Sequence, residues 1–389
     1  MGRVSELLAR ATAATSLEDF GESSFREGLE RLVASADTEA RLSTRGAAAF
    51  DLQIVDMLSW RLQIEHWYRL YPQIEEQEIV APLIGLGLPR TGSTALSCLL
   101  AEDPEARSIR GWEARSPCPP PETATELTDP RIAQAQEAMQ RRNQMFPRMK
   151  TMVPSSATSP TECQTFTAYD FKSQLFLPFA QLPSYAQWLL HEADLVPTYR
   201  YVKRVLKLLQ WRCPPTRWRL KSPMHTLYID ALVKVFPDAR FWMTHRDIAS
   251  VIPSVADLYF EMTRAFSDNV DKTFLGRLNV EMWELGLRRL IAFRDGSAGG
   301  RENQRFFDIQ FAPLQRDPFP ILAQLYQFMG EELTSEARTR MQAWRDNTPR
   351  DKHGAHNYAA SEFGLDTAAL REQFRFYSER FQVAPAASA

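Results

Sequence analysis

The sequence predicts a three-layer α/β domain with a mostly parallel, P-loop-like sheet, preceded by a helical N-terminal region. An apolar segment leads into a glycine-containing loop and then a helix-forming stretch near residue 90. A second apolar strand runs into a helix near residue 246. Strands that alternate with helices favour a parallel sheet with helices on its faces. The 389 residues, 44% of them hydrophobic and 24% charged, suffice for such a domain and its extensions.

The first part of the chain shows the periodicity of amphipathic helices. Its apolar residues recur at helical spacing: Phe25, Leu29, Leu32, Phe50, Ile54, Leu58 and Leu62. We expect residues 1–76 to form a helical region packed on an α/β domain of residues 77–383, and residues 384–389 to be a disordered tail. The helical region would pack against the sheet and narrow the entrance for the acceptor, and the alternative is a pure scaffold or the contact of a homodimer.

A glycine-containing loop organises the rest of the chain. The largely apolar segment Glu78–Leu83 before it predicts a buried parallel strand. Gly87 and Gly92 stand at the spacing of a P-loop, in which backbone amides at a helix N-terminus surround a phosphate. Ser93 stands where a P-loop kinase needs lysine, whereas Arg90 offers a cation three residues earlier. An ordinary strand-to-helix turn is the alternative.

Two strands far downstream end in polar residues. One strand, after Arg217, ends at Lys221, and the other, Arg240–Thr244, leads to Arg246. Ser254 follows Arg246 by eight residues. A planar guanidinium suits a phosphate, and open α/β sheets bind ligands at the carboxyl ends of their strands. A buried arginine–aspartate pair is the alternative role of Arg246.

With these motifs in view, the chain resembles the sulfotransferase superfamily, and most closely its bacterial branch with an LKSPxH element and a THRD element. These elements stand here as Leu220–His225 and Thr244–Asp247, and the resemblance covers most of the chain. It implies transfer of a sulfuryl group from 3′-phosphoadenosine 5′-phosphosulfate (PAPS) to an acceptor hydroxyl, with 3′-phosphoadenosine 5′-phosphate (PAP) as the product.

The resemblance also implies which residues hold the donor. The loop would hold the 5′-phosphosulfate, Arg246 and Ser254 the 3′-phosphate, and a basic C-terminal segment would close over the nucleotide. The residues in and directly after the loop are Arg90, Thr91, Gly92, Ser93 and Thr94. Those of the C-terminal segment are Arg350, Lys352, His353 and Gly354. A solvated run of charges is the alternative for that segment.

Three residues are candidates for the general base. Glu113 ranks first, because a short strand expected at Arg107–Gly111 would place it at the ligand-binding edge of the sheet. Some bacterial and carbohydrate sulfotransferases carry a catalytic glutamate at a comparable position. His225 ranks second, since a histidine near phosphates is expected to be held protonated. A donor to a phosphate and a structural residue at a helix N-terminus are its alternative roles. Glu162 is the third candidate, and a salt bridge is the alternative role of Glu113.

Charge stabilisation would come from cations rather than from a metal. Arg90 and Lys221 are expected to stabilise the oxygen between phosphate and sulfate as its bond to sulfur breaks. Aromatic residues crowd between 166 and 188 and form either core or an apolar acceptor pocket. The acceptor is therefore expected to be a small apolar alcohol, phenol or lipid rather than a polysaccharide.

Composition argues against several other classes of protein. The formal net charge of −2 provides no basic field for nucleic acid, and no apolar run reaches membrane-spanning length. The four cysteines are scattered, which indicates neither a metal site nor a disulfide framework, and no signal peptide is evident. We expect a cytoplasmic protein. The alternatives are a P-loop kinase-like phosphotransferase and a non-catalytic nucleotide-binding module.

Overall fold

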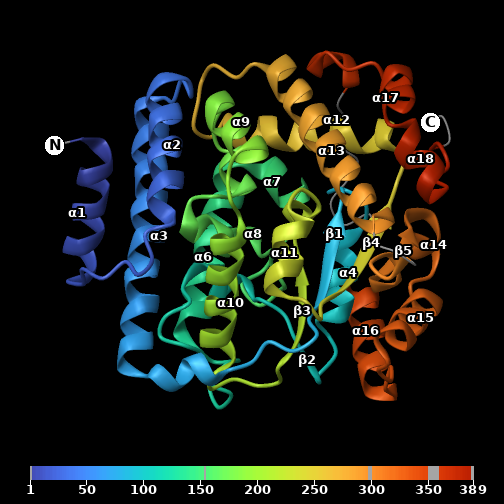
Figure 1. Cartoon of the computed structure of the whole chain (residues 1–389), viewed down its shortest axis with the longest axis horizontal. Coiled ribbons are helices and arrows are strands. Elements are labelled where there is room, and N and C mark those ends of the chain that lie inside the picture. The colour runs from blue at the N-terminus through green and yellow to red at the C-terminus, as the bar shows by residue number, and fades with distance from the viewer. Residues whose placement is uncertain (1, 153–154, 297–299, 349–358, 387–389) are drawn as a thin grey trace. The chain divides into compact units, whose positions relative to one another are not determined.

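The computed structural model describes residues 2–152, 155–296, 300–348 and 359–386 (Figure 1). The chain divides into two compact units. The first unit comprises Met1–Ile79, Ile109–Thr216 and Tyr259–Val270. The second unit comprises Val80–Ser108, Arg217–Leu258 and Asp271–Ala389. The domain boundaries expected after residues 76 and 383 stay predictions.

The first unit is built from helices, which confirms the helical N-terminal region. Ser43 begins the longest of them by accepting a hydrogen bond from the backbone N–H of Gly46 at 3.0 Å. The N-terminal helices are α1 (Arg3–Thr15), α2 (Phe25–Thr38) and α3 (Thr44–Leu70). The later elements are η1 (Pro72–Glu76), α5 (Gly111–Arg115), α6 (Pro130–Met145), α7 (Pro147–Met152), α8 (Gln164–Thr167), η2 (Ala168–Asp170), η3 (Gln174–Phe176), α9 (Pro183–His191) and α10 (Val196–Gln210).

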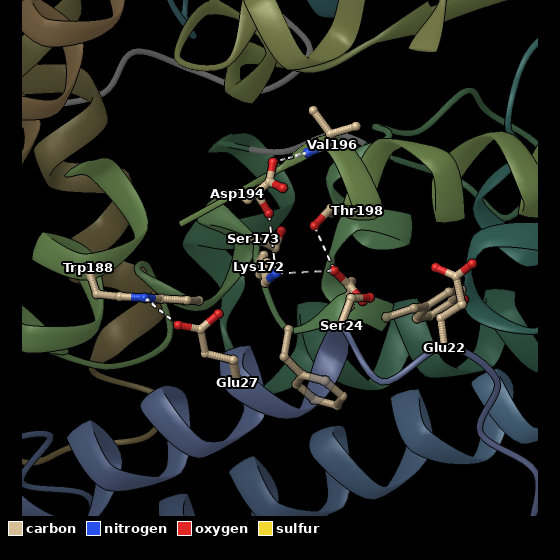
Figure 2. Close-up of polar contacts among 12 residues, drawn as sticks. Glu22, Ser24, Glu27, Lys172, Ser173, Trp188, Asp194, Val196 and Thr198 are labelled. Atoms are coloured by element: carbon tan, nitrogen blue, oxygen red, sulfur yellow. Dashed lines mark hydrogen bonds and ion pairs between the residues drawn. The ribbon is translucent and has the colours of Figure 1, made fainter. Parts of the chain in front are cut away.

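A buried charged cluster ties the elements of this unit together (Figure 2). Arg61 donates to two backbone carbonyls of the segment before α2, each at 2.7 Å, and lies 3.4 Å from the carboxylate of Asp170. Ser24 and Thr198 donate to the same carboxylate at 2.6 and 2.7 Å, and the ammonium of Lys172 is 4.0 Å away. Since these charges are paired, the cluster avoids the large cost of an isolated buried ion.

The aromatic residues between 166 and 188 belong to the core of the first unit. Phe171 stacks on Phe176, whose ring meets the edge of Tyr185. The buried members are Phe166, Tyr169, Phe171, Phe176, Tyr185 and Trp188. Their burial favours the core interpretation over an open acceptor pocket.

The second unit contains a five-stranded sheet with the strand order β2-β3-β1-β4-β5 (Figure 1). The strands are β1 (Leu83–Gly87), β2 (Ala106–Arg107), β3 (Arg217–Lys221), β4 (Arg240–His245) and β5 (Phe306–Gln310). All four neighbouring pairs are parallel, which confirms the predicted α/β class and its parallel sheet.

Two strand predictions need correction. β1 begins at Leu83, where the predicted strand ends, because Ala81 adopts a positive φ of 41° and Pro82 has no N–H for a ladder. The strand expected at Arg107–Gly111 ends at Arg107. Residue 110 instead forms an isolated antiparallel bridge with Pro160, and α5 begins at the next residue.

Helices cover both faces of the sheet. On one face, Leu83, Trp242 and Ile309 form one apolar cluster with α4 (Ser93–Leu100), α14 (Phe311–Arg316), α15 (Phe319–Met329) and α16 (Ser335–Asn347). On the other face, Phe306 contacts Phe293 of α13 (Lys272–Asp295), and His245 contacts α18 (Arg375–Phe381). The predicted three layers are therefore present. The remaining elements are η4 (Pro223–Thr226), α11 (Ile229–Val235), α12 (Ile248–Thr263), η6 (Asn303–Arg305), η8 (Ala360–Phe363) and α17 (Thr367–Gln373).

Gly85 is required where β1 passes the indole of Trp242. A Cβ at residue 85 would lie 2.1 Å from the Trp242 ring, so Gly85→Ala should lower the free energy of unfolding by about 1–3 kcal/mol. Gly2→Ala is the control, because a Cβ there meets nothing within 4 Å, and its effect should stay within about 0.5 kcal/mol. Equal denaturant midpoints for the two variants would contradict this packing.

Candidate functional site

The chain leaves β1 through the glycine loop, Gly87–Gly92, and enters α4. Gly87 and Gly92 have φ angles of 104° and 85°, which side chains rarely tolerate. Arg90, between them, also has a positive φ of 63°. A Cβ on Gly92 would lie 3.0 Å from the side-chain amide of Gln315. The spacing seen in the sequence therefore corresponds to a backbone conformation that depends on these two glycines.

Threonine hydroxyls hold the glycine loop at both ends. The backbone N–H of Gly87 donates to Thr226 Oγ1 at 2.7 Å. The hydroxyl of Thr91 donates to the carbonyl of Leu88 at 2.7 Å and lies 2.6 Å from the hydroxyl of Thr244. Neither Thr226 nor Thr244 was predicted as a site residue, although Thr244 begins the motif that contains Arg246 and Thr226 directly follows the motif that contains Lys221.

Arg90, Arg246 and Ser254 come together at the end of β4. Arg246 Nη1 donates to the backbone carbonyl of Arg90 at 2.8 Å, and Arg90 Nε donates to Ser254 Oγ at 3.2 Å. The guanidinium of Arg246 lies over the ring of Phe311, 4.3 Å from its centroid. Two cations that face one region create a positive potential suited to phosphates. Phe311 was not predicted, because it belongs to no recognisable sequence motif.

Lys221 reaches the start of α4 because β3 lies beside β1. Lys221 stands opposite Gly85 in the parallel register, and its Nζ lies 3.5 Å from Thr94 Oγ1. Burial raises the pKa of the Cys98 thiol to about 11, against the opposing effect of the Lys221 charge. Cys98 is therefore a neutral thiol at pH 7 rather than a nucleophile.

His225 lies in η4 and is buried. Burial lowers the pKa of His225 to about 3, so its imidazole is neutral at pH 7 in the protein alone. Protonation of this histidine beside bound phosphates stays a prediction. A group with so low a pKa accepts a proton weakly, which makes His225 a poor general base in this structure.

Glu113 lies in the first unit, as the third residue of α5. Its carboxylate is buried and accepts a hydrogen bond from the backbone N–H of Arg110 at 2.9 Å. The guanidinium of Arg110 pairs with Glu126 at 3.1 Å. Glu162 belongs to the same unit. The approach of either carboxylate to the donor stays a prediction.

Four predicted donor contacts, Arg350, Lys352, His353 and Gly354, lie outside the described residues. Within the described part of the chain, no group of three or more His, Cys, Asp or Glu side chains is arranged to hold a metal ion. No helix among the described residues combines the length and apolar character needed to cross a membrane.

Comparisons with known proteins identify the family of the chain. The sequence model of the sulfotransferase family matches residues 82–335, more than half of the chain. The chain is similar to the crystal structure of sulfotransferase STF9 from Mycobacterium avium, with 32% identity and a TM-score of 0.90 over 98% of this chain and 97% of that chain. It is also similar to the crystal structure of sulfotransferase STF1 from Mycobacterium tuberculosis H37Rv, with 29% identity and a TM-score of 0.85. That match covers 96% of this chain and 98% of the STF1 chain. A search of curated protein sequences finds no match.

The buried neutral His225 makes stability depend on pH. Folding lowers the pKa of His225 from 6.5 to about 3. Between pH 6.5 and about pH 3, this histidine therefore binds a proton only in the unfolded chain, and acid lowers the free energy of unfolding. Below about pH 6.5, His225→Asn should therefore lose less stability than the wild type, by about 1.4 kcal/mol per pH unit. Denaturant titrations at several pH values measure this difference.

His66→Asn is the matched control, because His66 is partly exposed and hydrogen-bonds to Arg69 near the surface. The control should follow the wild-type pH dependence. Parallel pH profiles for His225→Asn and the wild type would mean that His225 is not held neutral in the folded protein.

Proposed function

Because the chain belongs to the sulfotransferase family, we propose that it transfers a sulfuryl group from PAPS to an acceptor hydroxyl. The proposed acceptor, a small apolar alcohol, phenol or lipid, rests on the aromatic composition of residues 166–188 and not on a pocket formed by them. The observation that carries the proposal is the hydrogen-bonded cluster of Arg90, Arg246 and Ser254 beside the glycine loop. This cluster gathers two cations and a hydroxyl at the carboxyl edge of a parallel sheet, where α/β folds bind nucleotides.

The two ends of the donor would bind different parts of the cluster. The 3′-phosphate would accept hydrogen bonds from Arg246 and Ser254, which lie on the β4 end and on α12. The 5′-phosphosulfate would lie against Arg90, Thr91, Gly92, Ser93 and Thr94. The loop amides supply neutral donors, and Arg90 supplies charge. Arg350, Lys352, His353 and Gly354 remain proposed contacts to the nucleotide.

The reaction needs positioned charge and a base. PAPS supplies the sulfuryl group. As the acceptor oxygen forms its bond to sulfur, the bond from sulfur to the bridging phosphate oxygen breaks, and PAP leaves. Glu113 would take the acceptor's proton, while Arg90 and Lys221 would stabilise the negative charge on the departing phosphate. The leaving group is PAP, which is already part of the donor. The acceptor can therefore attack sulfur directly, and no covalent intermediate with the protein is required.

Glu113 remains the proposed base ahead of His225 and Glu162. Burial lowers the pKa of His225 to about 3, so this imidazole is no stronger a base than an ordinary carboxylate and loses the usual advantage of histidine as a general base. The four cysteines, Cys98, Cys118, Cys163 and Cys213, are scattered along the chain without the spacing of a disulfide framework. A scattered set of cysteines is typical of proteins from reducing compartments, which is why a cytoplasmic location is proposed.

A transfer assay with sulfur-labelled PAPS tests the function directly. A panel of apolar alcohols, phenols and lipids should yield at least one labelled sulfate ester, and phosphate-labelled ATP should yield no labelled acceptor. Transfer from ATP would establish the kinase-like alternative. Binding of PAP without transfer to any acceptor of the panel would support the non-catalytic module.

Removal of Arg246 should weaken donor binding. Arg246→Ala deletes the proposed charge-assisted contacts to the 3′-phosphate, worth about 1.5–3 kcal/mol, so the Kd for PAP should rise roughly tenfold to more than a hundredfold. Calorimetry measures this change. Arg277→Ala is the control, since Arg277 is an exposed cation of α13 in the same unit. An unchanged Kd for Arg246→Ala would overturn the 3′-phosphate assignment.

Removal of the base should stop transfer while the donor still binds. Glu113→Gln keeps the shape of the side chain but removes its basicity, so single-turnover transfer at saturating PAPS should fall by about 10²–10⁴-fold. The Kd for PAP should remain near the wild-type value. His225→Asn should retain more activity than Glu113→Gln, and the reverse ranking would identify His225 as the base.

A further inference from the structure

The residue that follows Arg246 is anchored to the C-terminal helix α17. Asp247 is only 5% exposed, and both of its oxygens are engaged. Arg371 of α17 donates to Oδ2 from Nη2 at 2.8 Å and to Oδ1 from Nε at 3.3 Å. The backbone N–H of Ala386 also donates to Oδ2, at 3.0 Å. A segment far along the chain thus holds the carboxylate beside Arg246.

The residue that precedes Arg246 is anchored to α18. His245 Nε2 lies 2.9 Å from Asp308 Oδ1, and Nδ1 lies 3.3 Å from the hydroxyl of Tyr377. The ring of Phe381 stacks on the imidazole with a centroid distance of 4.4 Å. Arg294 binds the carboxylate of Asp308 with both nitrogens of its fork, at 2.9 and 2.6 Å. Arg246 therefore stands between two residues whose side chains are fixed.

Asp247 also sets the start of α12, which carries Ser254. Its side chain accepts from the backbone N–H of Ala249 at 3.2 Å, and its carbonyl accepts from Ser250 and Val251 at 3.0 and 3.1 Å. These bonds satisfy the first donors of the helix. Whatever fixes Asp247 consequently fixes both Arg246 and the helix that carries Ser254.

Charge compensation gives the Arg371 contact a second role. Burial raises the pKa of Asp247, but hydrogen bonds from Arg371, Ala386 and Ala249 outweigh it and hold the pKa below its usual range. The carboxylate is therefore ionised at pH 7, one residue from the cation proposed to bind a phosphate. Without Arg371, this negative charge would repel the phosphate and attract Arg246 away from it.

We propose that Arg371 is a positioning residue for the 3′-phosphate, which acts through Asp247 on Arg246 and Ser254 without touching the nucleotide. This inference rests on the proposed function, because it assumes a donor with a 3′-phosphate. Arg371 is suited to the role, because its side chain is 42% exposed. Its guanidinium therefore neutralises the buried carboxylate of Asp247 without itself being a buried charge. The C-terminal helices thereby become part of the donor site.

The test compares two nucleotides that differ in the 3′-phosphate. Arg371→Ala should raise the Kd for PAP roughly tenfold and leave the Kd for adenosine 5′-monophosphate unchanged, as measured by calorimetry. Arg371→Lys keeps the charge but loses the fork, so its effect on PAP should be smaller. Arg375→Ala is the control, because Arg375 pairs with Glu372 and Glu379 at the surface of the same segment, and it should bind both nucleotides like the wild type.

A double variant separates positioning from direct contact. If Arg371 acts through Arg246, then Arg371→Ala should weaken PAP binding far less in an Arg246→Ala background than in the wild type. A full further loss would show that Arg371 touches the nucleotide, and an equal loss for PAP and adenosine 5′-monophosphate would show a general structural role. Either result overturns the proposal, and so does Arg371→Ala with unchanged affinity for PAP. A wild type that fails to bind PAP would instead refute the proposed function.

Discussion

The parallel register of β1 with its two neighbours is the constraint on which the site depends. Gly85 stands opposite Lys221 on β3, and Gly87 stands opposite Thr244 on β4. Because the three strands run in the same direction, their carboxyl ends meet at one edge. The glycine loop, Lys221 and Arg246 all leave the sheet there. A shift of one residue would turn every side chain of a strand to the opposite face and would separate these groups.

Arg90 and Arg246, the cations proposed to bind an anionic donor, repel one another while no donor is bound, so the fold must hold them in place. Arg246 is held by its hydrogen bond to the carbonyl of Arg90 and by the ring of Phe311. Asp247 would compete for Arg246, but Arg371 already occupies its carboxylate. Side chains that are fixed in advance need no reorganisation when charge develops, which is how preorganised sites stabilise a transition state.

Local sequence predicted the features that depend on near neighbours. The glycine loop with its following helix, and the eight-residue spacing from Arg246 to Ser254, could be recognised within contiguous segments, whereas the strand before the loop was predicted to end at Leu83, where β1 begins. Contacts between segments that are distant in the sequence produce no local pattern, so they could not be predicted. β1 contains two glycines, and glycine disfavours a strand in isolation. The strand forms here because the ring of Trp242 packs into the space that Gly85 leaves by having no side chain. The pair of Asp247 and Arg371 joins residues 124 positions apart, and the burial of His225 depends on tertiary packing.

The most direct test of the central claim uses the wild-type protein and two isomers of adenosine diphosphate. PAP and adenosine 5′-diphosphate carry the same number of phosphates, but only PAP has one on the 3′ oxygen. Calorimetry should show that PAP binds at least about tenfold more tightly, because Arg246 and Ser254 would meet only its 3′-phosphate. Equal affinities, or a preference for adenosine 5′-diphosphate, would contradict the account.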